Sequence, residues 1–196
     1  MNVMSSDRRR YELKARAERQ QQTRERIVAA TEDLHREVGP ARTTVADIAR
    51  RAGVQRLTVY NNFPALGDLL AACQGRFLAG HPPPDLAPRQ GLDPLAGLER
   101  ALRELYAWFR ANEALESNIH RDRQLLQELD DLLRRGPDQK FDAAAAAHAE
   151  LLGGGEARRR LIRLALQFST WQLLAGEGAS DAEIASLLSR AGDCAP

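Results

Sequence analysis

The chain has 196 residues, of which 43% are hydrophobic and 28% are charged, as in a soluble globular protein of one or two small domains. No apolar run approaches the roughly 20 residues of a membrane span, and the first residues lack the apolar core of a signal peptide, so we expect a cytoplasmic protein. Cys73 and Cys194 share no metal-type spacing with a histidine pair, so we expect no metal and no other cofactor, with Cys73 buried and Cys194 in a loose tail.

The net charge of +1 hides an asymmetry along the chain. Residues 1–63 contain 13 basic and 8 acidic side chains, a net charge of +5, whereas residues 64–196 contain 15 and 19, a net charge of −4. A basic surface suits a partner that is a polyanion, because each phosphate that it neutralises releases counterions. The first part of the chain is therefore the part expected to approach a nucleic acid.

Residues 1–22 form a polar, arginine-rich N-terminal extension with too little apolar surface to pack. One interpretation is a solvated extension that is partly helical when held in place. The other is an arm that contacts phosphates or the minor groove beside the main DNA contact. Truncation would separate the two.

From Thr23 onward apolar residues recur at helical spacing, and Gly39–Pro40 ends the predicted helix. We expect this helix to cover the back of the two helices that follow and to complete a three-helix unit. His35 lies beside the stripe and is interpreted as a surface or capping residue. The stripe itself consists of Ile27, Ala30, Thr31, Leu34 and Val38.

The stretch from Thr44 to Phe63 predicts a helix, a tight turn and a second helix. Thr44 can cap the first helix, with Asp47 reaching back toward the Thr44 amide. Gly53 suits the turn because glycine adopts a positive φ without a steric penalty. Once the apolar positions are buried, the outer face of the second helix carries Gln55, Arg56, Leu57, Thr58, Asn61 and Asn62.

An exposed helix with arginine, amide and hydroxyl groups can enter the major groove of DNA. Arg56 could bind a guanine through two hydrogen bonds, Thr58 could bind a base or a phosphate, and Leu57 could pack on a thymine methyl group. The alternative is an ordinary two-helix corner with a solvated face, because this geometry also occurs in proteins that never touch DNA.

The motif in this stretch resembles the DNA-binding domain of the tetracycline-repressor-like (TetR) family, with a match from about Thr23 to Leu70. Its residues are Thr43, Thr44, Val45, Asp47, Ile48, Ala49, Ala52, Gly53, Val54, Thr58, Val59, Tyr60 and Phe63. The resemblance implies that Thr44 and Tyr60 hold phosphates and that Arg56, Leu57 and Thr58 face bases. The predicted DNA-contact set is Thr43, Thr44, Gln55, Arg56, Leu57, Thr58, Tyr60, Asn61 and Asn62.

Three positions depart from the family pattern. Gln55 stands where a serine or threonine cap is common, which weakens the start of the second helix and frees Gln55 to reach a base. Asn61 and Asn62 replace frequent aromatic or histidine residues and are assigned to phosphate contact. Leu66 lies where a lysine often follows, so we expect no charged phosphate contact there.

The remaining chain predicts a larger helical domain, residues 71–196, after a helix-turn-helix domain at residues 23–70, so the fold class is all-α. A helix from Leu66 to Leu78 should run from the first domain into the second. The proline-rich stretch that follows cannot form a regular element and is a candidate for mobility. Further helical stripes are expected at residues 95–111, 115–119, 125–133, 141–152, 156–175 and 180–188. Gly136–Pro137 should end the third of these, and Ser180 should cap the last together with Glu183.

The predicted helix from Glu156 to Ala175 is apolar on more than one face, so both faces must be buried. One face can pack in its own domain and the other on a partner chain. The resemblance implies a homodimer through the last two helices. The alternative is a helix wholly inside the core.

A helical domain joined to a DNA reader by one helix suggests a ligand-gated switch. The candidate ligand residues are large groups offset from the main stripes, which together offer apolar walls and a few polar groups. They favour an apolar or aromatic small molecule, although each alone is also compatible with an ordinary core. The set is Tyr106, Trp108, Phe109, Ile119, His120, Phe141, His148, Phe168, Trp171 and Gln172.

These patterns together predict a sequence-specific transcriptional regulator: a homodimeric repressor that a small molecule releases from a palindromic operator. The alternative is a regulator whose C-terminal domain only dimerises or binds a protein partner. An enzyme is not expected, because the chain contains no HExxH, CxxC or GxSxG motif and no phosphate-cradling glycine loop.

Overall fold

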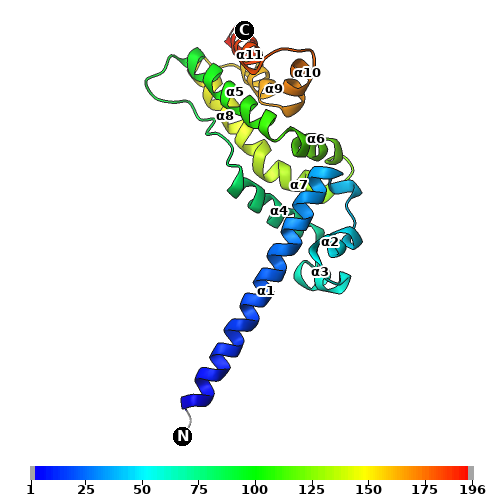
Figure 1. The fold of residues 1–196 in the computed structure, drawn as a ribbon. Helices are drawn as coiled ribbons and strands as arrows, with labels where there is room; N and C mark the ends of the chain where they lie inside the picture. Colours follow the sequence, from blue (N-terminus) through cyan, green and yellow to red (C-terminus); the bar gives the residue numbers. More distant parts are fainter. Residues whose placement is uncertain (1–2, 194–196) are drawn as a thin grey trace. The chain divides into compact units, whose positions relative to one another are not determined.

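A computed structural model describes residues 3–193, with side chains from residue 11 onward, so Cys194 lies outside the described residues. The regular elements of this part of the chain are all helices, which confirms the predicted all-α class (Figure 1). The chain divides into two compact units, Met1–Gly80 and His81–Pro196. The boundaries expected from sequence at residues 22/23 and 70/71 fall inside helices α1 (Val3–Glu37) and α4 (Leu66–Gly80). Among the described residues, no helix is long and apolar enough to span a bilayer.

The first unit contains α1, a short 3₁₀ turn at Pro40–Arg42, α2 (Val45–Ala52), α3 (Arg56–Asn62) and α4. Both α2 and α4 pack on α1, and α3 packs on α2. Helix α1 begins at Val3 rather than at Thr23, so the N-terminal extension continues the same helix as far as it is described. Apart from Ala15, the side chains of residues 11–22 are exposed, which agrees with the expectation that this segment has no surface to pack.

The core of the first unit forms around the predicted stripe of α1, with Ile27, Ala30, Thr31 and Leu34 buried. Val38 is an exception: the helix ends at Glu37, and Val38 is exposed. The surface position expected for His35 is also wrong, because α4 packs on α1 and buries it with its Nδ1 3.8 Å from Cys73 Sγ. Cys73 is buried as predicted, and burial raises the pKa of its thiol to about 12.

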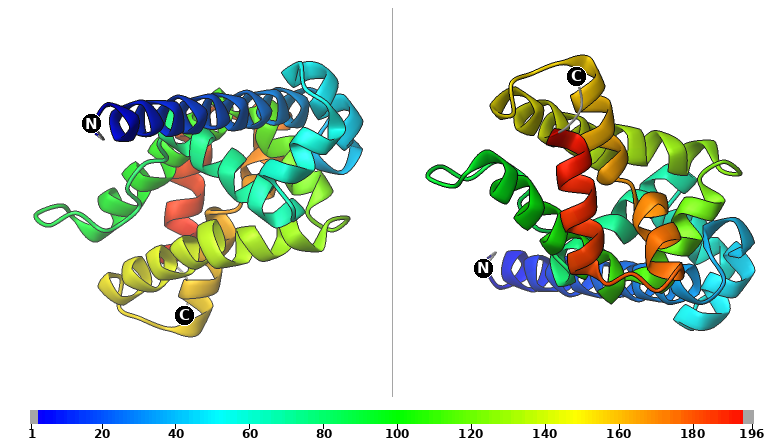
Figure 2. Two further views of the ribbon diagram at one scale, coloured as in Figure 1. Left: turned by 90° about the horizontal axis from the view of Figure 1, so that it is seen from below. Right: turned by 90° about the horizontal axis from the view of Figure 1, so that it is seen from above.

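The second unit consists of helices around one apolar core. Figure 2 shows these helices from two directions. Helix α5 packs on α11, α8 packs on α9, and α9 packs on α11. The proline-rich stretch between α4 and α5 contains no helix or strand, as expected. The helices are α5 (Pro94–Ala111), α6 (Glu113–Asp122), α7 (Gln127–Leu133), α8 (Gln139–Leu151), α9 (Glu156–Ala165), α10 (Phe168–Gly176) and α11 (Asp181–Asp193).

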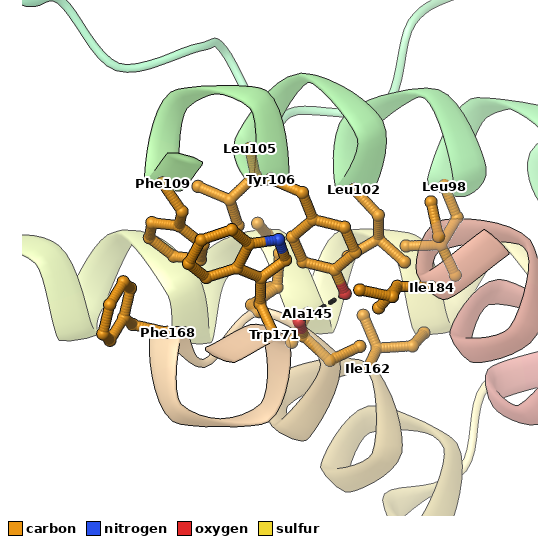
Figure 3. Close-up of a cluster of buried hydrophobic side chains, with 14 of the residues drawn as sticks. Leu98, Leu102, Leu105, Tyr106, Phe109, Ala145, Ile162, Phe168, Trp171 and Ile184 are labelled. Atoms are coloured by element: carbon orange, nitrogen blue, oxygen red, sulfur yellow. Dashed lines mark hydrogen bonds between the residues drawn. The ribbon is translucent and has the colours of Figure 1, made fainter. Parts of the chain in front are cut away.

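The long helix predicted at residues 156–175 is in fact two helices. Helix α9 ends at Ala165, and Gln167 has extended backbone angles, φ −78° and ψ 136°, before α10 begins. The break frees carbonyl groups of the last turn of α9 from the helical ladder. The buried hydroxyl of Tyr106 donates to the Ala165 carbonyl at 2.8 Å, so a long-range hydrogen bond stabilises the interruption (Figure 3).

The helix end predicted at Gly136–Pro137 is also wrong. A π-helical turn, Arg134–Asp138, carries the chain from α7 directly into α8. Pro137 has no amide hydrogen for the α-helical ladder, and the wider turn accommodates that loss. Arg123 bridges Asp130 and Asp138 at 2.7 and 2.9 Å, so an ion-pair network holds the turn.

The predicted capping box at the start of α11 is confirmed. The Ser180 amide donates to Glu183 Oε2 at 2.9 Å, and the Glu183 amide donates to Ser180 Oγ at 3.3 Å. In the same turn Asp181 accepts two hydrogen bonds from Arg110 at 2.7 and 2.9 Å and one from Trp171 Nε1 at 2.9 Å. The Arg110 guanidinium holds the pKa of Asp181 below its usual range, so α5, α10 and α11 meet at an ionised carboxylate.

His148 is a buried polar residue of α8. Its Nε2 lies 3.0 Å from the Leu86 carbonyl oxygen, and because a carbonyl only accepts, Nε2 carries the proton. Burial, which disfavours the charged ring, lowers the pKa of His148.

We expect this histidine to make stability depend on pH. Below about pH 6.5 this ring binds a proton in the unfolded chain but not in the folded chain. The free energy of unfolding therefore decreases as the pH is lowered, until the pH reaches the lowered pKa of His148 in the folded protein. His148→Gln keeps a hydrogen-bond donor for the Leu86 carbonyl. Between pH 7 and 5.5 the wild-type protein should lose free energy of unfolding of the order of 1 kcal/mol through this ring, and the variant should not, as measured by urea unfolding. His81→Gln, at an exposed position, is the control; equal slopes for both variants would contradict the prediction.

Candidate nucleic-acid interface

Helix α3 is positioned by two apolar side chains. Val59 lies within this helix of seven residues and Phe63 follows its last residue, and both are buried against α1 and α2. So short a helix is unstable alone, and its stability comes from this packing. The opposite side is left to solvent: Gln55, Arg56, Leu57, Tyr60 and Asn61 are exposed, with Leu57 at 65% and Tyr60 at 53%.

The turn before α3 has the predicted geometry. Gly53 ends α2 with φ +66° and ψ 40°, the left-handed conformation that favours glycine. The Val54 amide donates to the Ala49 carbonyl at 2.9 Å and closes the turn. Gln55 precedes α3 without a capping bond from its side chain, so the amide stays available, as the sequence suggested.

The start of α2 differs from the predicted capping box in one bond. The Asp47 amide donates to Thr44 Oγ1 at 3.2 Å, as expected, but the Asp47 carboxylate accepts from the Thr44 hydroxyl at 2.5 Å instead of from its amide. The hydrogen bond from this hydroxyl, and to a smaller extent the one from Arg50, lowers the pKa of Asp47. The hydroxyl of Thr43 likewise donates to the Gly39 carbonyl at 2.8 Å. Since a phosphate oxygen only accepts, either hydroxyl must release its present acceptor to donate to DNA.

The last two predicted contact residues of α3 behave differently from each other. Asn61 is exposed, whereas Asn62 is half-buried and its Nδ2 donates to the Thr58 carbonyl at 2.7 Å. Thr58 is also half-buried. The freely presented face is therefore centred on residues 55–57, 60 and 61.

Arg24 of α1 is a positioning residue that the sequence analysis did not single out. Its Nη1 donates to the Asn62 carbonyl at 2.6 Å, and its guanidinium lies 3.9 Å from the centroid of the Phe63 ring. A cation at a helix C-terminus is favourable because the free carbonyls there carry partial negative charge. The only sequence signal was a basic residue next to the stripe of α1, and nothing local linked it to residues almost forty positions away.

The residues proposed for ligand binding lie within or around the core of the second unit. Tyr106, Phe109, Phe168 and Trp171 are fully buried (Figure 3), and the Phe109 ring centroid lies 5.3 Å from that of Phe168 and 5.8 Å from that of Trp171. These four side chains therefore pack on one another as core residues do.

The other six residues surround this core. Trp108 Nε1 donates to the His81 carbonyl at 3.1 Å, the His120 ring stacks on Phe168 at 5.0 Å, and Gln172 Nε2 donates to Ser117 Oγ at 2.9 Å. Ile119 and Phe141 are half-buried, and His148 is buried. Among the described residues, no group of three or more histidine, cysteine or acidic side chains is placed to hold a metal ion.

A three-helix unit that presents a short polar helix beyond a glycine turn has the geometry of a helix-turn-helix DNA-binding domain. Residues 27–73 match the sequence model of the bacterial regulatory proteins of the tetR family. This match identifies residues 27–73 as a DNA-binding domain of the tetR family of transcriptional regulators. The family is one of regulators and not of enzymes.

The fold is similar to a crystal structure of a tetR-family transcriptional regulator from Streptomyces coelicolor. The two chains are 21% identical, and the match covers 88% of this chain and 79% of that chain with a TM-score of 0.62. No curated protein matches the chain in sequence.

Arg56 is expected to read one base. Arg56→Ala should cost about 1–3 kcal/mol of binding free energy and relax the preference at a single position, because it removes a bidentate donor. Tyr60→Phe, which removes one hydroxyl from the same exposed face, should weaken binding to all sequences alike. Binding curves on a panel of single-base operator variants measure both effects. An Arg56→Ala protein with unchanged affinity and preference would show that this side chain does not read DNA.

Proposed function

We propose that this regulator is a homodimeric repressor, acting in the cytoplasm, that binds a palindromic operator through Thr43, Thr44 and the exposed face of α3. The observation that carries the proposal is that face, which presents an arginine, amides and a tyrosine hydroxyl on a domain of the tetR family. One such helix reads only a few base pairs. Two copies related by a two-fold axis would read both halves of a symmetric site and give the specificity that a repressor needs.

Exposed leucines in the second unit support the dimer. Leu161 and Leu164 of α9, Leu173 of α10 and Leu187 of α11 are all exposed, and these three helices pack on one another. A single exposed leucine is ordinary, but several on adjoining helices indicate an association surface. The proposed interface is formed by the last two helices, α10 and α11, with α9 beside them.

We further propose that residues 81–196 regulate DNA binding by responding to a small molecule. A ligand that binds more tightly to the conformation that does not fit the operator would weaken DNA binding and release the repressor. The decrease in operator affinity can be no larger than the difference in the ligand's affinity for the two conformations. The close packing of the four buried aromatic rings favours a second candidate function, in which this unit only dimerises or binds a protein partner. Stabilisation of the protein by small compounds in thermal unfolding would distinguish the two.

Selection of bound fragments from random DNA tests the proposal as a whole. We expect sites with two-fold symmetry whose half-sites lie about one helical turn apart, because paired subunits place two α3 helices on one side of the duplex. Sequencing of the selected pool gives the result directly. A pool with only asymmetric sites would contradict the dimeric mode, and failure to enrich any sequence would contradict specific recognition.

Leu173→Glu should dissociate the dimer. A carboxylate in an apolar interface must be desolvated without a partner, so we expect the dimer dissociation constant to rise at least about tenfold, with a parallel loss of operator affinity. Sedimentation analysis over a range of protein concentrations measures the change. Leu125→Glu introduces the same charge at another exposed leucine, in the segment between α6 and α7, and should leave the dimer intact. A monomeric wild-type protein would refute the interface.

A further inference from the structure

Arg100 of α5 has a guanidinium edge without a partner. Its Nη1 donates to Glu104 Oε1 at 2.5 Å, but its Nε and Nη2 are buried and have no hydrogen-bond partner among the described residues. These two nitrogens lie on the same side of the planar group and point their hydrogens in parallel. That side is the edge that holds a carboxylate or another planar oxyanion through two hydrogen bonds.

Other arginines of the same unit use this edge for a carboxylate. Arg110 binds Asp181 through Nε and Nη2 at 2.9 and 2.7 Å, and Arg159 binds Glu156 through the same pair at 2.8 and 2.7 Å. Arg121 does the same with Asp122 at 2.7 and 3.1 Å. Arg100 thus has the same fork, in a more buried place, without the carboxylate.

The charges around Arg100 are not balanced. Glu104 is the acidic group that contacts it, and this carboxylate also faces Arg89 at 3.9 Å. The charge of Arg100 helps burial to lower the pKa of His148, and His148 directs its Nε2 proton to Leu86, so this ring adds no negative charge. Two cations therefore share one carboxylate, and a buried, unpaired donor pair carries a cost that an anion would remove.

The segment between α4 and α5 passes over this part of the second unit. Its His81 carbonyl accepts a hydrogen bond from Trp108 of α5, and its Leu86 carbonyl accepts one from His148 of α8. Trp108 lies on the same side of α5 as Arg100 and Glu104, two helical turns after Arg100 and one after Glu104. A group bound at the fork would lie among α5, α8 and this segment.

We propose that the Nε and Nη2 edge of Arg100 binds the carboxylate of a small organic acid, and that this acid is the effector of the regulator. The inference rests on the proposed ligand-controlled function and names the chemical class of the ligand. One planar fork with one uncompensated positive charge matches one carboxylate, whereas a phosphate dianion would require further donors.

The location also allows a bound ligand to affect the DNA-binding unit. The segment that carries His81 and Leu86 follows directly after α4, the last helix of the first unit. A carboxylate that fits only one arrangement of this segment would favour one conformation of the residues joined to α4. Differential binding of that kind is what a population shift requires.

Benzoate and benzamide provide a matched pair of probes, because they share a planar ring and differ in the charge of the polar group. We expect benzoate to bind the full-length wild-type protein in calorimetric titration and to raise its melting temperature, with no effect of benzamide. Arg100→Met should abolish the benzoate effect, and Arg100→Lys, which keeps the charge but loses the fork, should weaken binding at least about tenfold. Arg103→Met, an exposed arginine one turn further along α5, is the control and should bind benzoate normally.

Equal binding of benzoate by the wild-type and Arg100→Met proteins would overturn the inference, as would no binding of benzoate or equal stabilisation by inorganic sulfate. The link to regulation is measured on DNA recovered from the random-sequence selection, where benzoate should lower the affinity of the wild-type protein and leave Arg100→Met unaffected. If that DNA is bound and benzoate changes nothing, the assignment of the effector fails while operator recognition stands. If no DNA is selected, operator recognition itself fails.

Discussion

Burial of Val59 and Phe63 is the constraint on which the DNA-reading surface depends. A helix of seven residues cannot maintain itself in water, so α3 exists because these two side chains enter the core formed with α1 and α2. Arg24 adds a second attachment at the C-terminal end of the helix, through the Asn62 carbonyl and the Phe63 ring. Because both attachments use the inner side of α3, residues 55–57, 60 and 61 on the outer side stay exposed to a partner.

The parts of the fold that sequence could predict are those specified by neighbours in the chain. The turn at Gly53, the capping box at Ser180 and the apolar stripe of α1 each depend on residues within one or two helical turns, and the structure contains all three. The exposed face of α3 follows from the same local pattern, since the positions of Val59 and Phe63 determine which side chains remain outside. This local pattern is why DNA contact residues can be predicted from sequence.

The features that sequence could not predict depend on distant partners. The break after Ala165 is stabilised by the Tyr106 hydroxyl, 59 residues away, and the burial of His35 depends on α4, which brings Cys73 against it. Periodicity alone cannot tell a filled core from a lined cavity, so ligand contact by the aromatic residues stays a prediction. The unpaired edge of Arg100 could not be predicted from sequence either, because only the folded structure determines which donors have acceptors.

The N-terminal part of α1 can change its charge without affecting the folding of the first unit. Its described side chains from Tyr11 to Gln22, apart from Ala15, bury nothing, so substitutions there leave the core of the first unit untouched. The charge of this segment can therefore drift during evolution without a cost in folding. Such changes would alter the rate at which the protein associates with DNA and the dependence of that rate on salt concentration. The side chains that recognise the DNA sequence would stay the same.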